Sequence, residues 1–312
     1  MRLKSEFVNE VFLGVMVKLG HEYIVSIEKV VKNNNRELIG LQIRKTGEQI
    51  APVFYLDGYF EDSRYTISEV VDEVISSVSQ AHGISEDLGT LLDYAEVRDK
   101  LRFNVINYDA NQGQLKDIPH IKYLDLAIVF YLLLEKSKEG QMTTVVHNTI
   151  KDLWEVTDEQ LYIDSMKNMM VYMPAHIENV SEVIKEIAKE SMGEEYDEEL
   201  FDLIFDVPED MDMYVLSNDS KSMGAACMLY ESVLKEFSDK LGSNLIILPS
   251  SVHEVILIRQ IKDMAYEDCS CIVKDINIRE VPVQERLSNS AYLYDRVKRQ
   301  LSIAFQGEEV CK

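Results

Sequence analysis

Two short stretches of this 312-residue chain bring together side chains of the kinds that hydrolases use. Residues 249–254 hold Ser250, Ser251, His253 and Glu254, and a serine activated by a histidine and an acid is the nucleophile of many hydrolases. Successive side chains of a strand point to opposite faces, however, and the sequence contains no G-x-S-x-G turn. The pattern favours a β-turn followed by a strand-edge histidine, with a hydrolase-like site near this loop as the alternative.

The second stretch, His147-Asn148, lies between an expected strand and an expected helix. Both residues fit a polar site at a strand end, but asparagine is also a preferred residue just before a helix. We interpret Asn148 as the N-cap of a helix over 149–154. The histidines show neither H-x-x-x-H nor H-E-x-x-H spacing, and the glycines form no phosphate-binding loop. The sequence therefore predicts no catalytic residue, no cofactor and no metal site.

The formal net charge of the chain is −23, from 55 acidic and 32 basic residues. A nucleic-acid-binding protein needs basic side chains to neutralise phosphates, and an anionic membrane surface attracts basic segments. The charge balance therefore argues against both kinds of partner. A strongly acidic surface mainly favours solubility. The alternatives are an acidic surface for a protein partner with a basic surface, or mimicry of nucleic acid.

The expected compartment is the cytoplasm. Residues 1–14 lack the apolar core and cleavage site of a signal peptide. The longest apolar run, 124–134, is interrupted by Asp125 and is shorter than the about 20 residues that cross a bilayer. No C-x-x-C pair occurs, so we expect reduced thiols at Cys227, Cys269, Cys271 and Cys311.

Residues 1–85 have the pattern of a helix–β-meander–helix unit. Apolar residues at helical spacing predict a helix over 5–19, and Thr66 to Glu69 has the form of a capping box that begins a helix ending at residue 81. Between the two helices, β-branched segments alternate with turns rich in asparagine and glycine, which predicts strands over 23–31, 38–45 and 50–56.

Residues 86–312 are expected to form a larger unit, an antiparallel sheet packed by helices, so that the whole chain belongs to the α+β class. The patterns predict helices over 88–101, 149–154, 158–169, 177–191 and 263–277, and strands over 102–108, 124–134 and 143–147. The segment 194–212 carries a run of acidic residues and is expected to be a solvated helix or loop.

The second unit is organised around Met213–Ile258, its densest apolar stretch. Here the sequence predicts paired strands over 213–216 and 225–230, a helix over 231–241 that ends at Gly242, and further strands over 245–248 and 253–258. The segment Leu245–Leu248 is apolar throughout, which is typical of a strand in the middle of a sheet with both faces covered. Ile246 and Ile247 are therefore both expected to be buried. From residue 281 onward the chain is expected to be irregular.

Several blocks of this sequence resemble one known family. They are YLDGYFED at 55–62, VVHNTIKDLWEVTDEQLY at 145–162, Met213–Ile258, and the closing KDINIREVPVQERLSNSAYLYDR. The blocks are similar to a family of uncharacterised proteins of anaerobic gut bacteria, catalogued as a domain of unknown function, over nearly the whole chain. The resemblance implies a bacterial, cytosolic setting and no particular activity.

Two classes of function follow from the sequence. The first is a non-enzymatic binding or regulatory protein that uses an acidic surface or a groove to hold a partner. The second is a hydrolase-like enzyme with polar groups gathered near the 249–254 loop. The first is preferred because no motif in the sequence requires catalysis.

Overall fold

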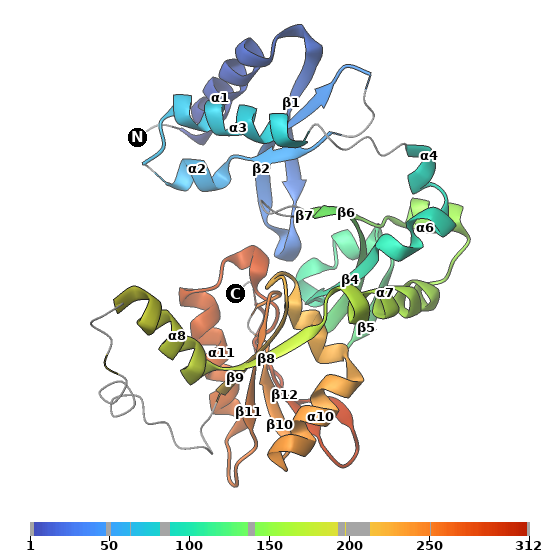
Figure 1. Ribbon diagram of the computed structural model, residues 1–312, viewed down its shortest axis with the longest axis vertical. Helices are drawn as coiled ribbons and strands as arrows, with labels where there is room; N and C mark the ends of the chain where they lie inside the picture. The colour runs from blue at the N-terminus through green and yellow to red at the C-terminus, as the bar shows by residue number, and fades with distance from the viewer. Residues whose placement is uncertain are drawn as a thin grey trace.

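The chain folds into antiparallel β-sheets with helices packed against them (Figure 1). The computed structural model describes residues 3–47, 51–62, 64–81, 88–136, 141–192, 197, 213–249 and 251–310. Three sheets lie within these residues, of three, four and six strands. The predicted α+β class is confirmed, and the acidic segment 194–212 lies outside the described residues except for Asp197.

The three-stranded sheet belongs to the N-terminal helix–meander–helix unit that the sequence predicts. Its elements are α1 (Lys4–Leu19), β1 (Tyr23–Val31), β2 (Glu37–Lys45), β3 (Val53–Tyr55), α2 (Asp57–Glu61) and α3 (Ile67–Ala81). The capping box is formed, because the Glu69 carboxylate accepts the Thr66 N–H at 2.8 Å and the Glu69 N–H donates to Thr66 Oγ1 at 3.3 Å. The helices and sheet share an apolar core that includes Val11, Leu41 and Val74.

The four-stranded sheet follows, with two helices after its last strand. Its elements are α4 (Leu88–Leu91), α5 (Tyr94–Val97), β4 (Leu101–Asn107), β5 (His120–Tyr123), β6 (Leu126–Lys136), β7 (Gln141–Val145), α6 (Asn148–Trp154) and α7 (Asp158–Tyr172). The expected hairpin is present as β6 and β7. The single helix predicted over 88–101 is wrong, because the Asp93 side chain accepts the Ala95 N–H at 2.9 Å and starts a new helix there.

The six-stranded sheet forms the C-terminal part of the molecule. Its elements are β8 (Ala175–Asn179), α8 (Val180–Met192), β9 (Met213–Asn218), α10 (Glu231–Leu241), β10 (Leu245–Leu248), β11 (Val255–Arg259), α11 (Tyr266–Arg279), β12 (Ala291–Asp295) and β13 (Gln300–Phe305). The strand order is β13-β12-β10-β11-β9-β8.

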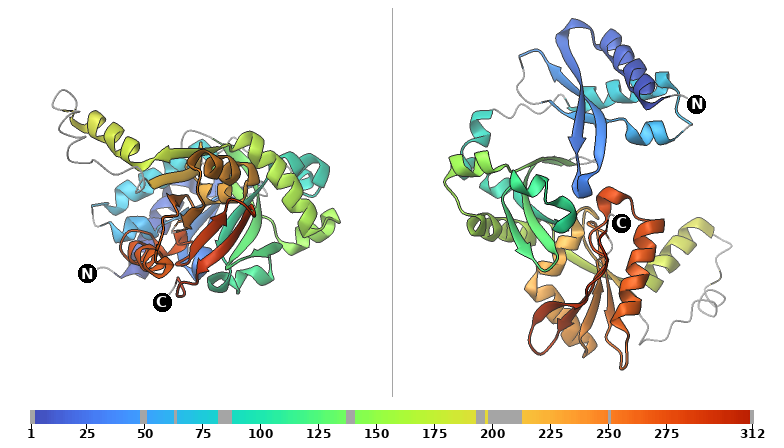
Figure 2. Two further views of the ribbon diagram at one scale, coloured as in Figure 1. Left: turned by 90° about the horizontal axis from the view of Figure 1, so that it is seen from below. Right: turned by 180° about the vertical axis from the view of Figure 1, so that it is seen from behind.

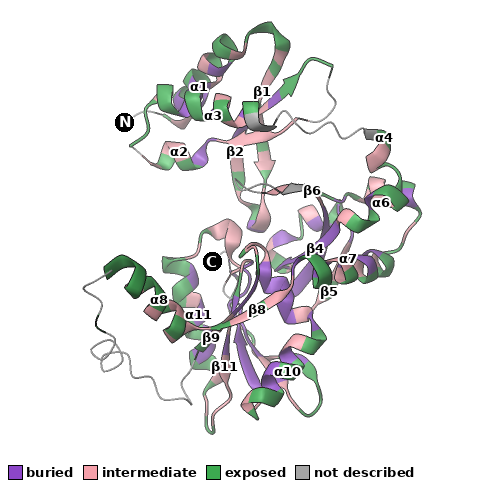
Figure 3. Ribbon diagram, viewed as in Figure 1, coloured by how far each residue is buried: buried purple, intermediate pink, exposed green. Residues whose placement is uncertain are grey.

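Strand β10 lies near the middle of this sheet, as the sequence predicts. All four of its residues are buried, and Ile246 and Ile247 have no exposed surface. Figure 3 shows the central strands of this sheet coloured as buried. Ile247 packs into the largest apolar cluster, whereas Ile246 packs into a separate cluster with Val273 of α11. Both faces of the strand are therefore covered, and the predicted burial is confirmed.

Three predictions for this part of the chain are wrong. Residues 224–229 form a buried 3-10 turn instead of a strand, since the left-handed Met223 (φ 54°) turns the chain into the core. Residues 175–179 pair with β9 as an edge strand instead of starting a helix, and α8 begins only at Val180. The segment after residue 281, expected to be irregular, contains the β12–β13 hairpin.

The N-terminal unit reaches the rest of the molecule through the tip of its β1–β2 hairpin (Figure 2). This tip is the short 3-10 turn Asn33–Asn35, which hydrogen-bonds to residues after β4 and before β12. The apolar cluster of the N-terminal unit is separate from those of the two other sheets. The division into units over 1–85 and 86–312 stays a prediction.

Candidate functional site

The serine and histidine of the 249–254 loop form backbone contacts. The Ser251 hydroxyl accepts the backbone N–H of His253 at 3.1 Å. On the His253 ring, Nδ1 accepts the Met223 N–H at 3.2 Å, and Nε2 lies 3.9 Å from Glu285 Oε2. The ring therefore holds the turn at residue 223, and this arrangement lends no support to a serine nucleophile activated by His253.

The remaining residues of that loop add little to the site. Glu254 is exposed, and Ser250 lies outside the described residues.

Cys227, on the neighbouring 3-10 turn, is free and fully buried. Burial raises the pKa of its thiol to about 12, so Cys227 stays protonated and is a poor nucleophile.

Asn148 joins α6 to the loop before β5, and the neighbouring His147 does not. The Asn148 side chain donates to the Lys116 carbonyl at 3.0 Å, and its backbone N–H donates to the Asp117 carbonyl at 3.0 Å. The cap position is occupied by the exposed His147, which makes no side-chain cap bond. The predicted Asn148 cap is wrong, because that side chain bonds the Lys116 carbonyl instead of its own helix. His147 follows the second sheet, whereas His253 precedes β11 of the third.

A cavity of about 360 Å³ lies between the second sheet and the C-terminal segment, within the range of volumes that hold small ligands. Its walls come from the loop after β4, the turn between β5 and β6, and the residues that precede β12 and follow β13. The lining residues are Asn107, Asp109, Ala110, Gln112, Asp125, Ser288, Gln306, Gly307, Glu308, Glu309 and Val310.

Asp125 is the carboxylate most firmly fixed in this cavity. It follows Leu124, whose left-handed backbone (φ 56°) makes the tight turn between β5 and β6. Asp125 Oδ2 accepts the hydroxyls of Ser288 at 2.7 Å and Ser290 at 2.8 Å, and Oδ1 accepts the Tyr292 hydroxyl at 2.5 Å. A polar turn of the second sheet is thereby attached to the third.

These hydroxyls stabilise the charge of Asp125 without neutralising it. Burial, followed by the charge of Asp125 and their hydrogen bond, raises the pKa of Tyr292 well above its ordinary value, so the tyrosine stays a donor. Within the described residues Asp125 bonds hydroxyls and no Lys, Arg or His pairs with it, so it presents an ordered negative charge to the cavity.

The loop after β4 is held by Asn107. Its Nδ2 donates to the Leu287 carbonyl at 3.1 Å, and its Oδ1 accepts the Ala110 N–H at 2.9 Å. Asn107 is buried, so these bonds replace its contacts with water. The same side chain thus connects β4, the loop that lines one wall of the cavity and the segment before β12.

The cavity is strongly acidic. Asp109, Asp125, Glu308 and Glu309 line it, and no basic side chain lines it among the residues described. Two cations in the described network bond lining residues: Lys274 donates to Glu308 at 2.7 Å, a hydrogen bond that raises the pKa of Lys274, and Arg286 donates to the Val310 carbonyl at 3.3 Å. A positively charged group is the ligand that this wall chemistry favours.

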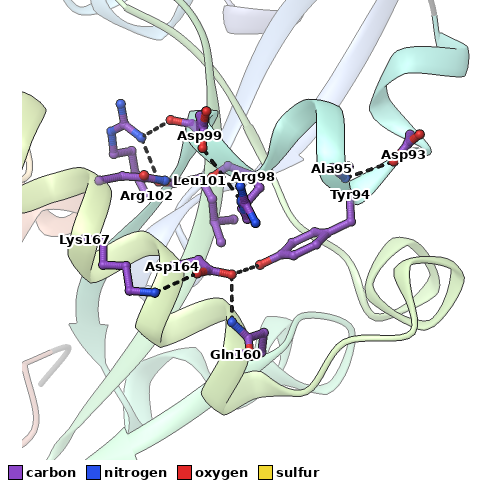
Figure 4. A network of polar contacts seen from close by, with 11 residues as sticks. Asp93, Tyr94, Ala95, Arg98, Asp99, Leu101, Arg102, Gln160, Asp164 and Lys167 are labelled. Atoms are coloured by element: carbon purple, nitrogen blue, oxygen red, sulfur yellow. Dashed lines mark hydrogen bonds and ion pairs between the residues drawn. The ribbon is translucent and has the colours of Figure 1, made fainter.

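A second polar cluster lies beside α7, between α5 and the start of β4 (Figure 4). Asp164 accepts the Tyr94 hydroxyl and the Gln160 amide, each at 2.8 Å, and Lys167 lies 3.5 Å away. Burial alone raises the pKa of Asp164, but these hydrogen bonds lower it below its ordinary value. The cluster fastens α5 to α7, and Lys167 already pairs with its carboxylate.

Arg102, also in this region, is a buried cation. Its Nη1 donates to the carbonyls of Asp99 and Leu101, each at 2.8 Å, and its guanidinium lies 5.0 Å from the Tyr172 ring centre. Burial lowers the pKa of Arg102, and its Nε has no hydrogen-bond partner in the described part of the chain. Backbone carbonyls and an aromatic face thus take the place of a carboxylate.

Comparisons with known proteins place the chain in a family. Residues 4–296 match a family of unknown function, DUF5688. The chain belongs to this family. No curated protein and no solved structure matches it.

The described residues contain no group of three or more His, Cys, Asp or Glu arranged to hold a metal ion. No described helix is long and apolar enough to span a membrane.

The cavity is the part of the site that sequence reasoning missed. A signal for it exists, because Asp125 is the one charge inside the apolar run 124–134. A carboxylate inside such a run must either reach solvent or find donors. The donors lie more than 160 residues further along the chain, at Ser288 and Ser290.

Proposed function

We propose that this protein is a non-enzymatic binding protein that holds a cationic group of its partner in the acidic cavity. The observation that carries the proposal is Asp125, which lines the cavity, is fixed by three hydroxyls and forms no ion pair with the described residues. Three further acidic residues line the same cavity. An ordered, uncompensated carboxylate among acidic neighbours favours a positive ligand.

The chemistry of the walls favours a guanidinium group. A guanidinium presents five N–H donors and is more weakly hydrated than an ammonium group. It can donate to Asp125 Oδ1, which accepts a single hydroxyl among the described residues, and to a second carboxylate of the wall. The volume of about 360 Å³ accommodates one long basic side chain. Because Asp125 is already ordered, little conformational freedom is lost there when the ligand binds.

The partner that fits this chemistry is a protein with a basic surface, met in the cytoplasm. The net charge of −23 steers such a surface toward the molecule and repels the phosphates of nucleic acids and anionic lipids. Arginine side chains are enriched at protein interfaces and are frequent anchors there. We place the anchor of this partner in the cavity.

Titration with a pair of matched peptides tests the proposal. The first is Gly-Gly-Arg-Gly-Gly with blocked ends, and the second carries citrulline, an uncharged isostere, in place of arginine. We expect calorimetry at low salt to show binding of the arginine peptide, with the citrulline peptide at least about tenfold weaker, since the pairing is charge-assisted. Equal affinities for the two peptides would contradict the role of charge.

Two variants locate the binding site. Asp109 is exposed and lines the cavity, so Asp109→Asn removes one charge there while leaving the fold intact. Asp117 is also exposed and lies in the same connection between β4 and β5, but it does not line the cavity, so Asp117→Asn is the matched control. We expect Asp109→Asn to weaken binding of the arginine peptide and Asp117→Asn to leave it unchanged. Equal effects of the two variants would show that only the overall charge matters.

A further inference from the structure

The tip of the β1–β2 hairpin is bonded to the loop that lines one wall of the cavity. Asn34 is 4% exposed and left-handed (φ 57°, ψ 36°), and its backbone N–H donates to Asn111 Oδ1 at 2.7 Å. Asn111 Nδ2 in turn donates to Asn33 Oδ1 at 2.8 Å and Asn34 Oδ1 at 2.9 Å. Ala110 and Gln112, on either side of Asn111, line the cavity.

The same tip is bonded to the opposite wall. Asn34 Nδ2 donates to the carbonyls of Val283 at 2.8 Å and Arg286 at 2.7 Å, and Asn33 Nδ2 donates to the Gln284 carbonyl at 2.8 Å. The Arg286 guanidinium then donates to the carbonyl of Val310 at 3.3 Å, and Val310 is a lining residue. Two short polar paths therefore lead from the tip to the two walls.

These contacts are polar, whereas each unit has an apolar core of its own. The residues that bury the N-terminal helices against their sheet form one cluster, and those of the second and third sheets form others. Amide contacts exchange for water at little net cost, while separate cores keep each unit folded. The tip can therefore leave its site without unfolding either unit.

We propose that the Asn33–Asn35 tip is a latch that shapes the cavity. With the tip docked, Asn111 and Arg286 hold the loop after β4 and the segment at Val310 in the arrangement that forms the two walls. With the tip released, both walls lose these bonds and become mobile. Where the cavity binds the cationic group of our proposed function, ligand and docked tip stabilise one another, because coupling between two sites is reciprocal.

Two asparagine-to-glycine variants at neighbouring positions test the latch. Asn34→Gly removes the side-chain bonds, and glycine adopts the left-handed backbone without strain. Asn35 has the same φ of 57°, is exposed, and its side chain forms no hydrogen bond with the described residues, so Asn35→Gly is the matched control. Hydrogen–deuterium exchange is measured over 108–112, 305–310 and, as an internal reference, 245–248.

We expect exchange over 108–112 and 305–310 to be about tenfold faster or more in Asn34→Gly, with 245–248 and the Asn35→Gly protein as in the wild type. Binding of the arginine peptide should weaken about fivefold or more in Asn34→Gly alone. If Asn34→Gly leaves hydrogen–deuterium exchange unchanged over 108–112 or over 305–310, the tip does not act as a latch. If exchange over 245–248 is also faster, Asn34→Gly has destabilised the whole protein. The comparison is then repeated with Asn33→Ala, which is a smaller change at the tip.

The two proposals fail separately. If the wild-type protein does not bind the arginine peptide, the proposed function is wrong. Hydrogen–deuterium exchange of the two walls still shows whether the tip orders them. If the wild type binds the peptide and Asn34→Gly loosens both walls without changing the affinity, the latch does not regulate the cavity and the inference is wrong.

Discussion

Strand β10 and the surroundings of Asp125 are both buried, but different forces hold them. Ile246 and Ile247 have no exposed surface, and apolar clusters cover both faces of their strand. Around Asp125, the buried Ser288, Ser290 and Tyr292 contribute hydroxyls that surround a charge. Apolar packing depends on filling volume and not on the direction of any bond. The polar junction, which consists of Asp125, Ser288, Ser290 and Tyr292, needs each hydroxyl donor in place. The cavity lies at this polar junction, where a fixed charge can bind a ligand.

The largest expected effect is at β10. Truncating Ile246 or Ile247 to Ala leaves a cavity in a fully packed region, and each should lower the free energy of unfolding by about 2–5 kcal/mol. The control is Ile278→Ala on α11, where the side chain is 53% exposed. This change should cost less than about 1 kcal/mol. Urea denaturation of the three variants measures the free energy of unfolding. If both β10 variants are about as stable as the wild type, β10 is not a central, fully covered strand.

A smaller effect is expected at the polar junction. Tyr292→Phe keeps the ring and removes the hydroxyl that donates to Asp125, so we expect a loss of about 1.5–3 kcal/mol in the free energy of unfolding, the range for hydrogen bonds to charged groups. Tyr294 gives the matched control, because it is also buried but its hydroxyl has no partner in the described residues. Tyr294→Phe should be neutral or stabilising.

Urea denaturation of the two tyrosine variants decides between specific bonding and simple burial. Equal losses from Tyr292→Phe and Tyr294→Phe would show that the hydroxyl bond to Asp125 adds nothing beyond packing. The comparison between apolar and polar burial would then be wrong.

The smallest effect is the pH dependence of the Tyr292 contribution. The pKa of Tyr292 in the folded protein is raised well above the ordinary value of 10.0. Below pH 10 the tyrosine is protonated in both the folded and the unfolded state, so its full contribution to stability is present. Above that pH, the unfolded chain releases the proton while the folded protein keeps it, and stability falls as pH rises. The difference between wild type and Tyr292→Phe should shrink by about 1 kcal/mol from about pH 9 to about pH 11. Urea midpoints of both proteins measure it, and a constant difference would contradict the raised pKa.

Local patterns predicted most of the helices and strands. The capping box at Thr66, the stop at Gly242 and the apolar run at 245–248 are signals within a few residues of one another, and all three elements are present. The 3-10 turn after Met223 was missed because its buried alanines and cysteine are compatible with a strand, and only tertiary packing selects the turn.

The site was harder to predict than the fold. The bonds from Asp125 to the hydroxyls, and from Asn34 to Asn111, join residues far apart in the chain, and no local spacing reports them. The predicted polar candidates were chosen as neighbours in sequence, but Ser251 and His253 contact one another through the backbone.

A crystal structure of the protein with the blocked Gly-Gly-Arg-Gly-Gly peptide would show whether the cavity beside Asp125 receives a cationic group. We expect the guanidinium inside the cavity, within about 3 Å of the Asp125 or Asp109 carboxylate, the distance of a charge-assisted hydrogen bond. A peptide bound at another acidic surface, with the cavity beside Asp125 unoccupied, would contradict this expectation.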